Sequence, residues 1–218
     1  MPVLTAEALG CPVPPQDLAA RVMPVKELDP GVTELWRIHR GVYGPIHYNR
    51  RSTGGQPYRF DAPDDTFGVL YASPSFAACM AEAVVRDRFQ GESLPLLLDE
   101  AELTLRCVSR LGTATNRPLR LADLTQPHFH LGMDNRILST ADYRGPNLWS
   151  AAIHAAYPDI DGLYFTSRFA NEASVAIFDR VRIVAQGEPI PLAQFPLLPA
   201  FLESYDIGIA PAQDPWNS

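Results

Sequence analysis

The sequence predicts an α+β fold. Short apolar runs of strand type and segments with helical spacing are both present, and they do not alternate in the regular order of a βαβ protein. A chain of 218 residues, 46% of them hydrophobic, is long enough to bury one sizeable core. We therefore expect a single compact domain with an extension at each end.

The domain is expected to occupy residues 31–188. Residues 1–30 are punctuated by prolines and contain one short helical pattern, Gln16–Val22, so we interpret them as an N-terminal extension. Residues 189–218 combine prolines with apolar side chains, and we expect this C-terminal tail to pack on the domain or on a partner.

The first core strand is expected at Thr33–His39, with Arg37 within it. From Gly41 to Pro57 the chain is dominated by Gly, Asn, Arg, Ser and Tyr, a composition typical of a mobile loop. Beside a phosphate-binding site, such a loop would serve as a lid.

A strand and a helix follow in direct succession. Gly68–Ala72 is a short apolar run that predicts a strand. With Ser73 as N-cap and Pro74 at the first helical position, apolar spacing predicts a helix over Phe76–Val85. Glu82 would lie about two turns into this helix among apolar neighbours, where a carboxylate must find a partner or shift its pKa.

The second half of the chain supplies the remaining elements. Apolar or alternating runs predict strands at Leu94–Leu98, Glu102–Ser109, Asp161–Thr166, Ser174–Phe178 and Arg180–Gln186. Helical patterns are present at Pro118–Leu124 and Leu148–Ala156.

Composition excludes several classes of protein. A net charge of −7 argues against direct binding of nucleic acid. No apolar stretch approaches the ~20 residues of a membrane helix, and the first eighteen residues do not look like a signal peptide. Three cysteines without a CxxC pair indicate neither a disulfide scaffold nor a zinc site. We expect a cytoplasmic protein, with secretion by a signal-independent route left open.

Four motifs resemble, in order and spacing, those of RES-domain proteins, a family named after its Arg, Glu and Ser. They are Trp36-Arg37, Tyr58-Arg59-Phe60, Leu70-Tyr71-Ala72-Ser73 followed by Ala81-Glu82, and Asp161 to Arg168. The resemblance covers roughly Glu34 to Phe178. It implies an ADP-ribosyltransferase-like fold, with a mixed sheet core and flanking helices, and an enzyme that consumes NAD+.

The expected chemistry gives each motif residue a role. Cleavage of the nicotinamide–ribose bond passes through an oxocarbenium-like state, which a carboxylate near the ribose stabilises. Glu82 would supply that carboxylate, and Tyr71 would stack on the nicotinamide. Arg37 and Arg59 would bind the pyrophosphate, because a guanidinium fork matches phosphate oxygens. By the resemblance, Ser167 would hold the carboxamide or a ribose hydroxyl. NAD+ is the substrate in this scheme, and no metal or further cofactor is required.

Three functions stay open at this point. The first is an NAD+ glycohydrolase, which in this family is a toxin neutralised by an antitoxin that carries a helix-turn-helix DNA-binding domain. The second is a protein mono-ADP-ribosyltransferase, and the third is a catalytically silent module that binds a nucleotide or a partner. A homo-oligomer is also possible.

The identity of the second phosphate-binding arginine is open as well. Pro57-Tyr58 stands where the family usually has glycine, and the preceding segment is long and basic. Arg50 or Arg51 therefore competes with Arg59 for this role.

Other polar residues receive weaker assignments. Thr166 is an alternative to Ser167, and Arg168 is a secondary candidate for the site. His128 and His130 form an HxH pattern that lacks further ligands nearby, so a metal site is not expected there.

Overall fold

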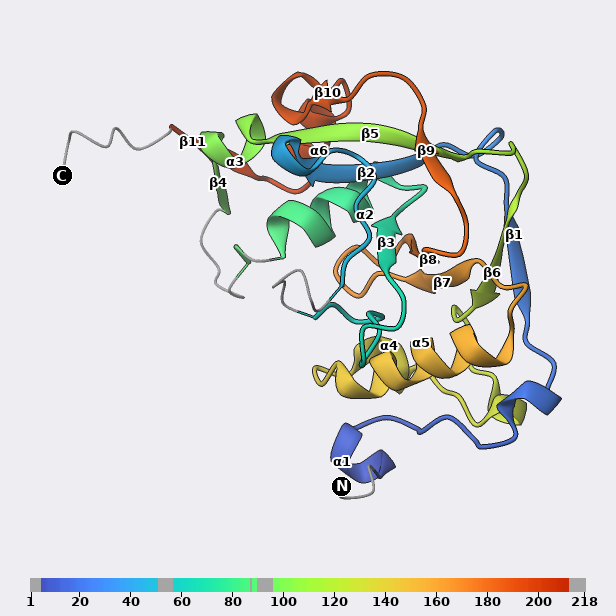
Figure 1. Ribbon diagram of the computed structural model, residues 1–218. Coiled ribbons are helices and arrows are strands. Elements are labelled where there is room, and N and C mark those ends of the chain that lie inside the picture. The colour runs from blue at the N-terminus through green and yellow to red at the C-terminus, as the bar shows by residue number, and fades with distance from the viewer. Residues whose placement is uncertain (1–4, 51–56, 87, 90–95, 212–218) are drawn as a thin grey trace.

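Two sheets form the centre of the protein, and a backbone bridge between Trp36 and Ser73 joins them (Figure 1). The computed structural model describes residues 5–50, 57–86, 88–89 and 96–211. The larger sheet has the strand order β1-β6-β7-β8-β3, in which β6 and β7 run parallel and the other neighbours antiparallel. Its strands are β1 (Val25–Leu28), β3 (Val69–Ala72), β6 (Leu119–Asp123), β7 (Gly162–Thr166) and β8 (Ala173–Phe178).

The second sheet is built around β5, which pairs antiparallel with β2 and also with β9 and β10. A short parallel pair, β4 with β11, lies apart from both sheets. The strands are β2 (Leu35–Arg40), β4 (Leu97–Asp99), β5 (Arg106–Thr113), β9 (Ile183–Ala185), β10 (Ile190–Pro191) and β11 (Gly208–Ala210). Backbone hydrogen bonds of 2.8 and 2.9 Å between Trp36 and Ser73 join β2 to the end of β3.

Helices pack around the two sheets, and α2 (Phe76–Met80) contacts strands of both. The α-helices are α1 (Ala6–Leu9), α2 (Phe76–Met80), α3 (Glu100–Thr104), α4 (Arg136–Ser139), α5 (Arg144–Ala156) and α6 (Leu198–Ser204). A π-helical turn, η4 (Ala81–Val85), continues α2. Short 3-10 turns are η1 (Leu18–Ala20), η2 (Gly41–Tyr43), η5 (Phe129–Leu131) and η6 (Leu192–Gln194).

The larger sheet is buried on both faces, and β8 shows how the sequence achieves this. Ala176 and Phe178 pack with α5, whereas Val175 and Ile177 pack between the two sheets. Successive side chains of a strand point to opposite faces, so an uninterrupted apolar run buries both. Figure 1 shows α4 and α5 on the side of this sheet that faces away from β2 and β5.

Close packing of β7 on β8 depends on Gly162. A Cβ atom at this position would lie 2.3 Å from the carbonyl oxygen of Ala176. Only glycine permits that approach, which keeps β7 and the residues that follow it at their place in the sheet.

Residues before 31 contribute to the core. Leu9 and Leu18 are buried in the cluster around α5, and β1 pairs with β6 at the edge of the larger sheet. The sequence did not predict β1. Toward the other end, Phe195, Leu198 and Phe201 pack in the cluster around α2. The division of the chain into an extension, a domain and a tail stays a prediction.

Most predicted elements are confirmed, with their ends shifted by a few residues. The confirmed strands correspond to β2, β3, β7, β8 and β9, and the confirmed helices to α5 and to α2 with η4. Gln16–Val22 contains only the turn η1, and Leu94–Leu98 overlaps β4, with its first two residues outside the described part of the chain.

Two segments were predicted with the wrong type of secondary structure. Pro118–Leu124 was expected to be helical, but it forms β6, because Leu119 and Leu121 alternate with Arg120 and pair with strands on both sides. The start of Glu102–Ser109 was expected to be strand, but it lies in α3, whose N-cap Asp99 accepts a hydrogen bond from the Ala101 amide at 2.8 Å.

The N-cap of the helix that carries Glu82 also differs from the prediction. Ser75, not Ser73, caps α2, and its side chain accepts a hydrogen bond from the Ala78 amide at 3.1 Å. Ser73 instead donates to the carbonyl of Ala173 on β8 at 2.6 Å and accepts from the Ser75 amide. Pro74 therefore precedes the helix, and Ser73 fastens the end of β3 to β8.

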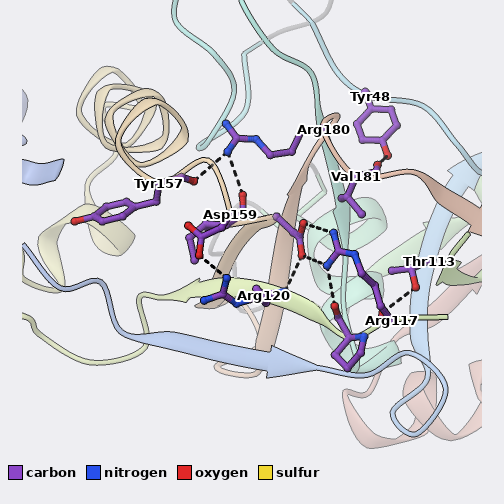
Figure 2. Close-up of polar contacts among 11 residues, drawn as sticks. Tyr48, Thr113, Arg117, Arg120, Tyr157, Asp159, Arg180 and Val181 are labelled. Carbon is purple, nitrogen blue, oxygen red and sulfur yellow. Dashed lines mark hydrogen bonds and ion pairs between the residues drawn. The ribbon is translucent and has the colours of Figure 1, made fainter. Parts of the chain in front are cut away.

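Arg180 belongs to a group of polar contacts that fixes the C-terminal end of α5 (Figure 2). Arg180 donates to the carbonyls of His154, Tyr157 and Ile160, which satisfies groups that a helix end leaves unpaired. Beside it, the buried carboxylate of Asp161 accepts two hydrogen bonds from Arg117, at 2.7 and 2.6 Å. The network thus joins α5 to the strands next to it.

No helix within the described ranges has both the length and the apolar character needed to cross a membrane.

Candidate active site

A cleft of about 580 Å³ opens where β2, β3 and the α2–η4 helix come together. Four of the five predicted site residues line it: Arg37, Arg59, Tyr71 and Glu82. The fifth, Ser167, is 1% exposed and lies behind Glu82. The fold therefore brings together residues that are up to 130 positions apart in the chain (37 to 167).

The cleft is strongly cationic although the protein as a whole carries a charge of −7. Among its described lining residues, the arginines are Arg37, Arg40, Arg59, Arg86, Arg106 and Arg168. Glu82 is the only carboxylate in that described lining. Low-dielectric walls concentrate such a field, so the cleft favours an anionic ligand.

Arg37 on β2 is held by backbone carbonyls. Its Nη1 donates to the carbonyl of Tyr71 at 2.8 Å and its Nη2 to that of His47 at 3.2 Å. Its Nε is buried and has no hydrogen-bond partner among the described residues. Burial lowers the pKa of Arg37 to about 10, so the side chain is still charged at neutral pH. A buried cation with an unsatisfied N–H gains from an anionic acceptor.

Arg59 reaches the cleft from the loop before β3. Its Nη1 donates to the carbonyls of Ile137 and Thr140, at 3.3 and 3.1 Å, at the end of α4. Its guanidinium carbon lies 4.7 Å from the ring centre of Tyr143. Burial lowers the pKa of Arg59. These contacts hold a cation in the cleft wall rather than in solvent.

Arg50, the proposed alternative to Arg59, is directed elsewhere. It donates to the carbonyl of Asp65 and forms an ion pair with Asp179, and it does not belong to the described lining of the cleft. Arg51 lies outside the described residues. The geometry therefore favours Arg59 over Arg50 as the second cation of the cleft.

Tyr71 lines the cleft, and its hydroxyl is already engaged in hydrogen bonds. The hydroxyl donates to Asp61 Oδ1 at 2.9 Å and accepts from the Phe60 amide at 2.9 Å. Burial, and after it the negative charge of Asp61, raises the pKa of Tyr71 well above its ordinary value. Its ring lies 5.6 Å from that of Tyr58 in an edge-to-face arrangement. Tyr71 is thus suited to stacking and not to proton transfer.

Glu82 lies on the π-helical turn η4. In this turn the Arg86 amide donates to the Ala81 carbonyl at 2.8 Å, five residues earlier. Such turns are rare and occur often at functional sites. The Glu82 side chain is 33% exposed, so it is not the deeply buried carboxylate that its apolar neighbours indicated. Glu82 therefore lies in the cleft lining with part of its side chain exposed.

Two neighbours determine the orientation of Glu82. Ser167 donates to its Oε1 at 2.7 Å, and Arg86 lies 3.7 Å from its Oε2. Ser167 also accepts hydrogen bonds from the amides of Phe169 and Ala170. The Ser167 hydroxyl is buried and engaged in these bonds, so in this structure it supports Glu82. Direct contact between Ser167 and a substrate stays a prediction.

The weaker candidates fall partly inside the cleft. Arg168 lines it and is exposed, whereas Thr166 does not belong to its described lining. His128 and His130 contact backbone carbonyls, of Asp123 and Val22 respectively. Within the described ranges, no group of three or more His, Cys, Asp or Glu is arranged to hold a metal ion.

Sequence reasoning missed several residues of the cleft. Tyr58, Arg86 and Tyr143 line it, and Asp61 supports it from behind. Arg86 was accessible to prediction, because a residue four positions after Glu82 lies on the same helical face. Tyr143 was not, since only the packing of α5 against the loop after Pro57 brings it near.

Comparisons with known proteins agree with this architecture. The family model described as RES domain matches residues 34–198. Curated proteins include no match to this sequence. Among solved structures, a chain in the crystal structure of the M. tuberculosis MbcT–MbcA toxin–antitoxin complex aligns with a TM-score of 0.58 and 16% identity, over 88% of this chain and 95% of that one. The predicted α+β fold, with mixed sheets and flanking helices, is thereby confirmed.

Proposed function

This chain belongs to the RES-domain family, and from that membership we propose that it is an NAD+ glycohydrolase that acts as a toxin. The reaction releases nicotinamide and ADP-ribose. One observation carries the proposal: the only carboxylate in the described lining of the cleft, Glu82, shares that lining with six arginines. A dinucleotide with a cationic leaving group and an anionic pyrophosphate matches that distribution of charge.

The pyrophosphate would bind to Arg37 and Arg59. Each guanidinium is already fixed by backbone carbonyls, so little side-chain freedom is lost when a phosphate binds. The burial of Arg37 supports this assignment, because a cation in the cleft lining that is largely removed from water gains more from an anionic partner than an exposed cation does.

Bond cleavage would take place between Tyr71 and Glu82. The ring of Tyr71 would hold the nicotinamide, and Glu82 would accept a hydrogen bond from the ribose 2′-hydroxyl. As the glycosidic bond breaks, its electron pair goes to the nicotinamide, which leaves as the neutral base. The Glu82 carboxylate stabilises the positive charge that develops on the ribose, and water then attacks the anomeric carbon and loses a proton.

Partners and place of action follow from the same proposal. The structural neighbour comes from a toxin–antitoxin complex, which supports an antitoxin partner, and we expect one with a helix-turn-helix DNA-binding domain. Val42 and Tyr43, which are 84% and 65% exposed next to the cleft residue Arg40, supply apolar surface for such a contact. The cytoplasm, which contains NAD+, is the expected place of action.

Growth and cellular NAD+ together test the proposal. Induced expression in a bacterial host should arrest growth as the NAD+ pool falls, and Glu82→Gln should relieve both effects. The variant must accumulate to the same level and melt at the same temperature as the wild type. Arrest at an unchanged NAD+ pool would contradict the glycohydrolase, and ADP-ribose found on host proteins would favour the transferase.

A further inference from the structure

Asp61 is a buried carboxylate that joins three segments of the cleft wall. It is 1% exposed and does not belong to the described lining of the cleft. Its Oδ1 accepts a hydrogen bond from the Tyr71 hydroxyl at 2.9 Å. Its Oδ2 accepts from the Tyr58 amide at 2.6 Å and from the Asn49 side chain. All three donors belong to residues that line the cleft.

The loop that carries Asp61 is fixed from its other side by α5. Asn147 donates to the carbonyls of Tyr58 and Arg59, at 2.9 and 3.0 Å, and Ser150 donates to that of Phe60 at 2.7 Å. The backbone from Tyr58 to Phe60 therefore has a fixed position. Asp61 transfers this rigidity to Tyr71 on β3, so that the rings of Tyr58 and Tyr71 keep their edge-to-face arrangement.

We propose that Asp61 is a positioning residue that sets the aromatic wall formed by Tyr58 and Tyr71, and that this wall selects the planar nicotinamide of NAD+. This inference rests on the proposed function. Asp61 touches no substrate itself. It accepts hydrogen bonds at both oxygens, so an asparagine of the same size would direct an N–H toward at least one donor and break a hydrogen bond to the Tyr71 hydroxyl or to the Tyr58 amide.

Binding measurements separate this role from a purely structural one. The parent protein is the Glu82→Gln variant, which should bind NAD+ without consuming it. The affinities of this parent for NAD+ and for ADP-ribose are measured by calorimetry. Asp61→Asn in the parent should lower the affinity for NAD+ by about tenfold or more. The affinity for ADP-ribose should fall by less than about threefold, because ADP-ribose lacks the nicotinamide. Tyr71→Phe keeps the ring and removes the hydroxyl with its bonds to Asp61 and to the Phe60 amide, and it should shift the preference in the same direction.

Asp161→Asn is the matched control. Asp161 is also a buried carboxylate with several hydrogen bonds, but its partners are Arg117 and the Arg120 amide, and it lies outside the described lining of the cleft. The Asp161→Asn substitution should lower the melting temperature and leave the ratio of the NAD+ and ADP-ribose affinities unchanged.

Three results would overturn the inference. One is an equal loss of affinity for NAD+ and for ADP-ribose in Asp61→Asn. Another is an unchanged NAD+ affinity in a folded Asp61→Asn variant. If Asp61→Asn does not fold, the Tyr71→Phe variant takes its place. An unaltered ratio of NAD+ affinity to ADP-ribose affinity in Tyr71→Phe is then the third contradicting result. A parent that binds neither NAD+ nor ADP-ribose would instead contradict the proposed function, and the inference with it.

Discussion

The hydroxyl of Ser167 donates to Oε1 of Glu82 at 2.7 Å from the segment that follows β7, 85 positions away in the sequence. The same hydroxyl oxygen accepts from the amides of Phe169 and Ala170, at 3.2 and 3.3 Å. With its lone pairs occupied by N–H donors, its proton is directed to the carboxylate. Glu82 is thus held in one orientation by a residue that is itself buried.

Removal of this support should slow the reaction more than it weakens binding. Ser167→Ala is expected to lower kcat by about tenfold or more with a small change in KM, since a misoriented Glu82 loses contact with the transition state. Steady-state NAD+ consumption measures both constants. Ser204→Ala, which removes an exposed hydroxyl bonded to the Ala200 carbonyl, is the control and should leave both unchanged. A rise in KM alone would place Ser167 in contact with substrate.

Arg59 and Arg50 should differ sharply in their effect on KM. Arg59→Lys loses the guanidinium fork in the cleft wall and should raise KM for NAD+ by about tenfold. Arg50→Lys alters a side chain paired with Asp179 and should affect only stability. Kinetics and thermal melts of both variants check this pair. The assignment fails if Arg50→Lys raises KM as much as Arg59→Lys.

His154 should make the protein less stable in mild acid. Its ring stacks on Phe67 at 4.0 Å, and burial, followed by the charge of Arg180, lowers its pKa from 6.5 to about 4 against a smaller opposing effect of Asp179. The unfolded chain then binds a proton that the folded chain does not, so stability falls as the pH drops from about 6.5 to about 4.

His154→Phe keeps a stacked ring and removes the titration, so its melting temperature should change less between pH 7 and pH 4.5. His130→Phe, at an exposed position, is the control and should retain the wild-type pH dependence. Equal slopes in all three proteins would contradict the role of His154.

Local patterns predicted much of the fold, and the resemblance to the RES-domain motifs pointed to Arg37, Arg59, Tyr71 and Glu82, which line the cleft. Arg37 on β2, Tyr71 on β3 and Glu82 on the following helix were placed on the correct elements, because strand runs and helical spacing are local signals. The helix assigned to Pro118–Leu124 was wrong because β6 is defined by its pairing with β1 and β7, and such pairing is not visible in a seven-residue window.

The parts of the site that could not be predicted depend on contacts across the fold. Glu82 lies on a π-helical turn that apolar spacing did not reveal, and the Tyr71 hydroxyl is engaged by Asp61, a residue on another segment. The roles of Ser167 and Arg59 likewise depend on partners 85 and 78 positions away. Composition and spacing carry no information about such contacts.

The central claim is that the cleft around Glu82 cleaves NAD+, and product analysis with purified protein tests it most directly. Wild-type protein should convert NAD+ to equal amounts of nicotinamide and free ADP-ribose, resolved by chromatography. Glu82→Gln, with an unchanged melting temperature, should slow this by about a hundredfold or more. Intact NAD+ after incubation with the wild type, or equal rates in wild type and variant, would contradict the account.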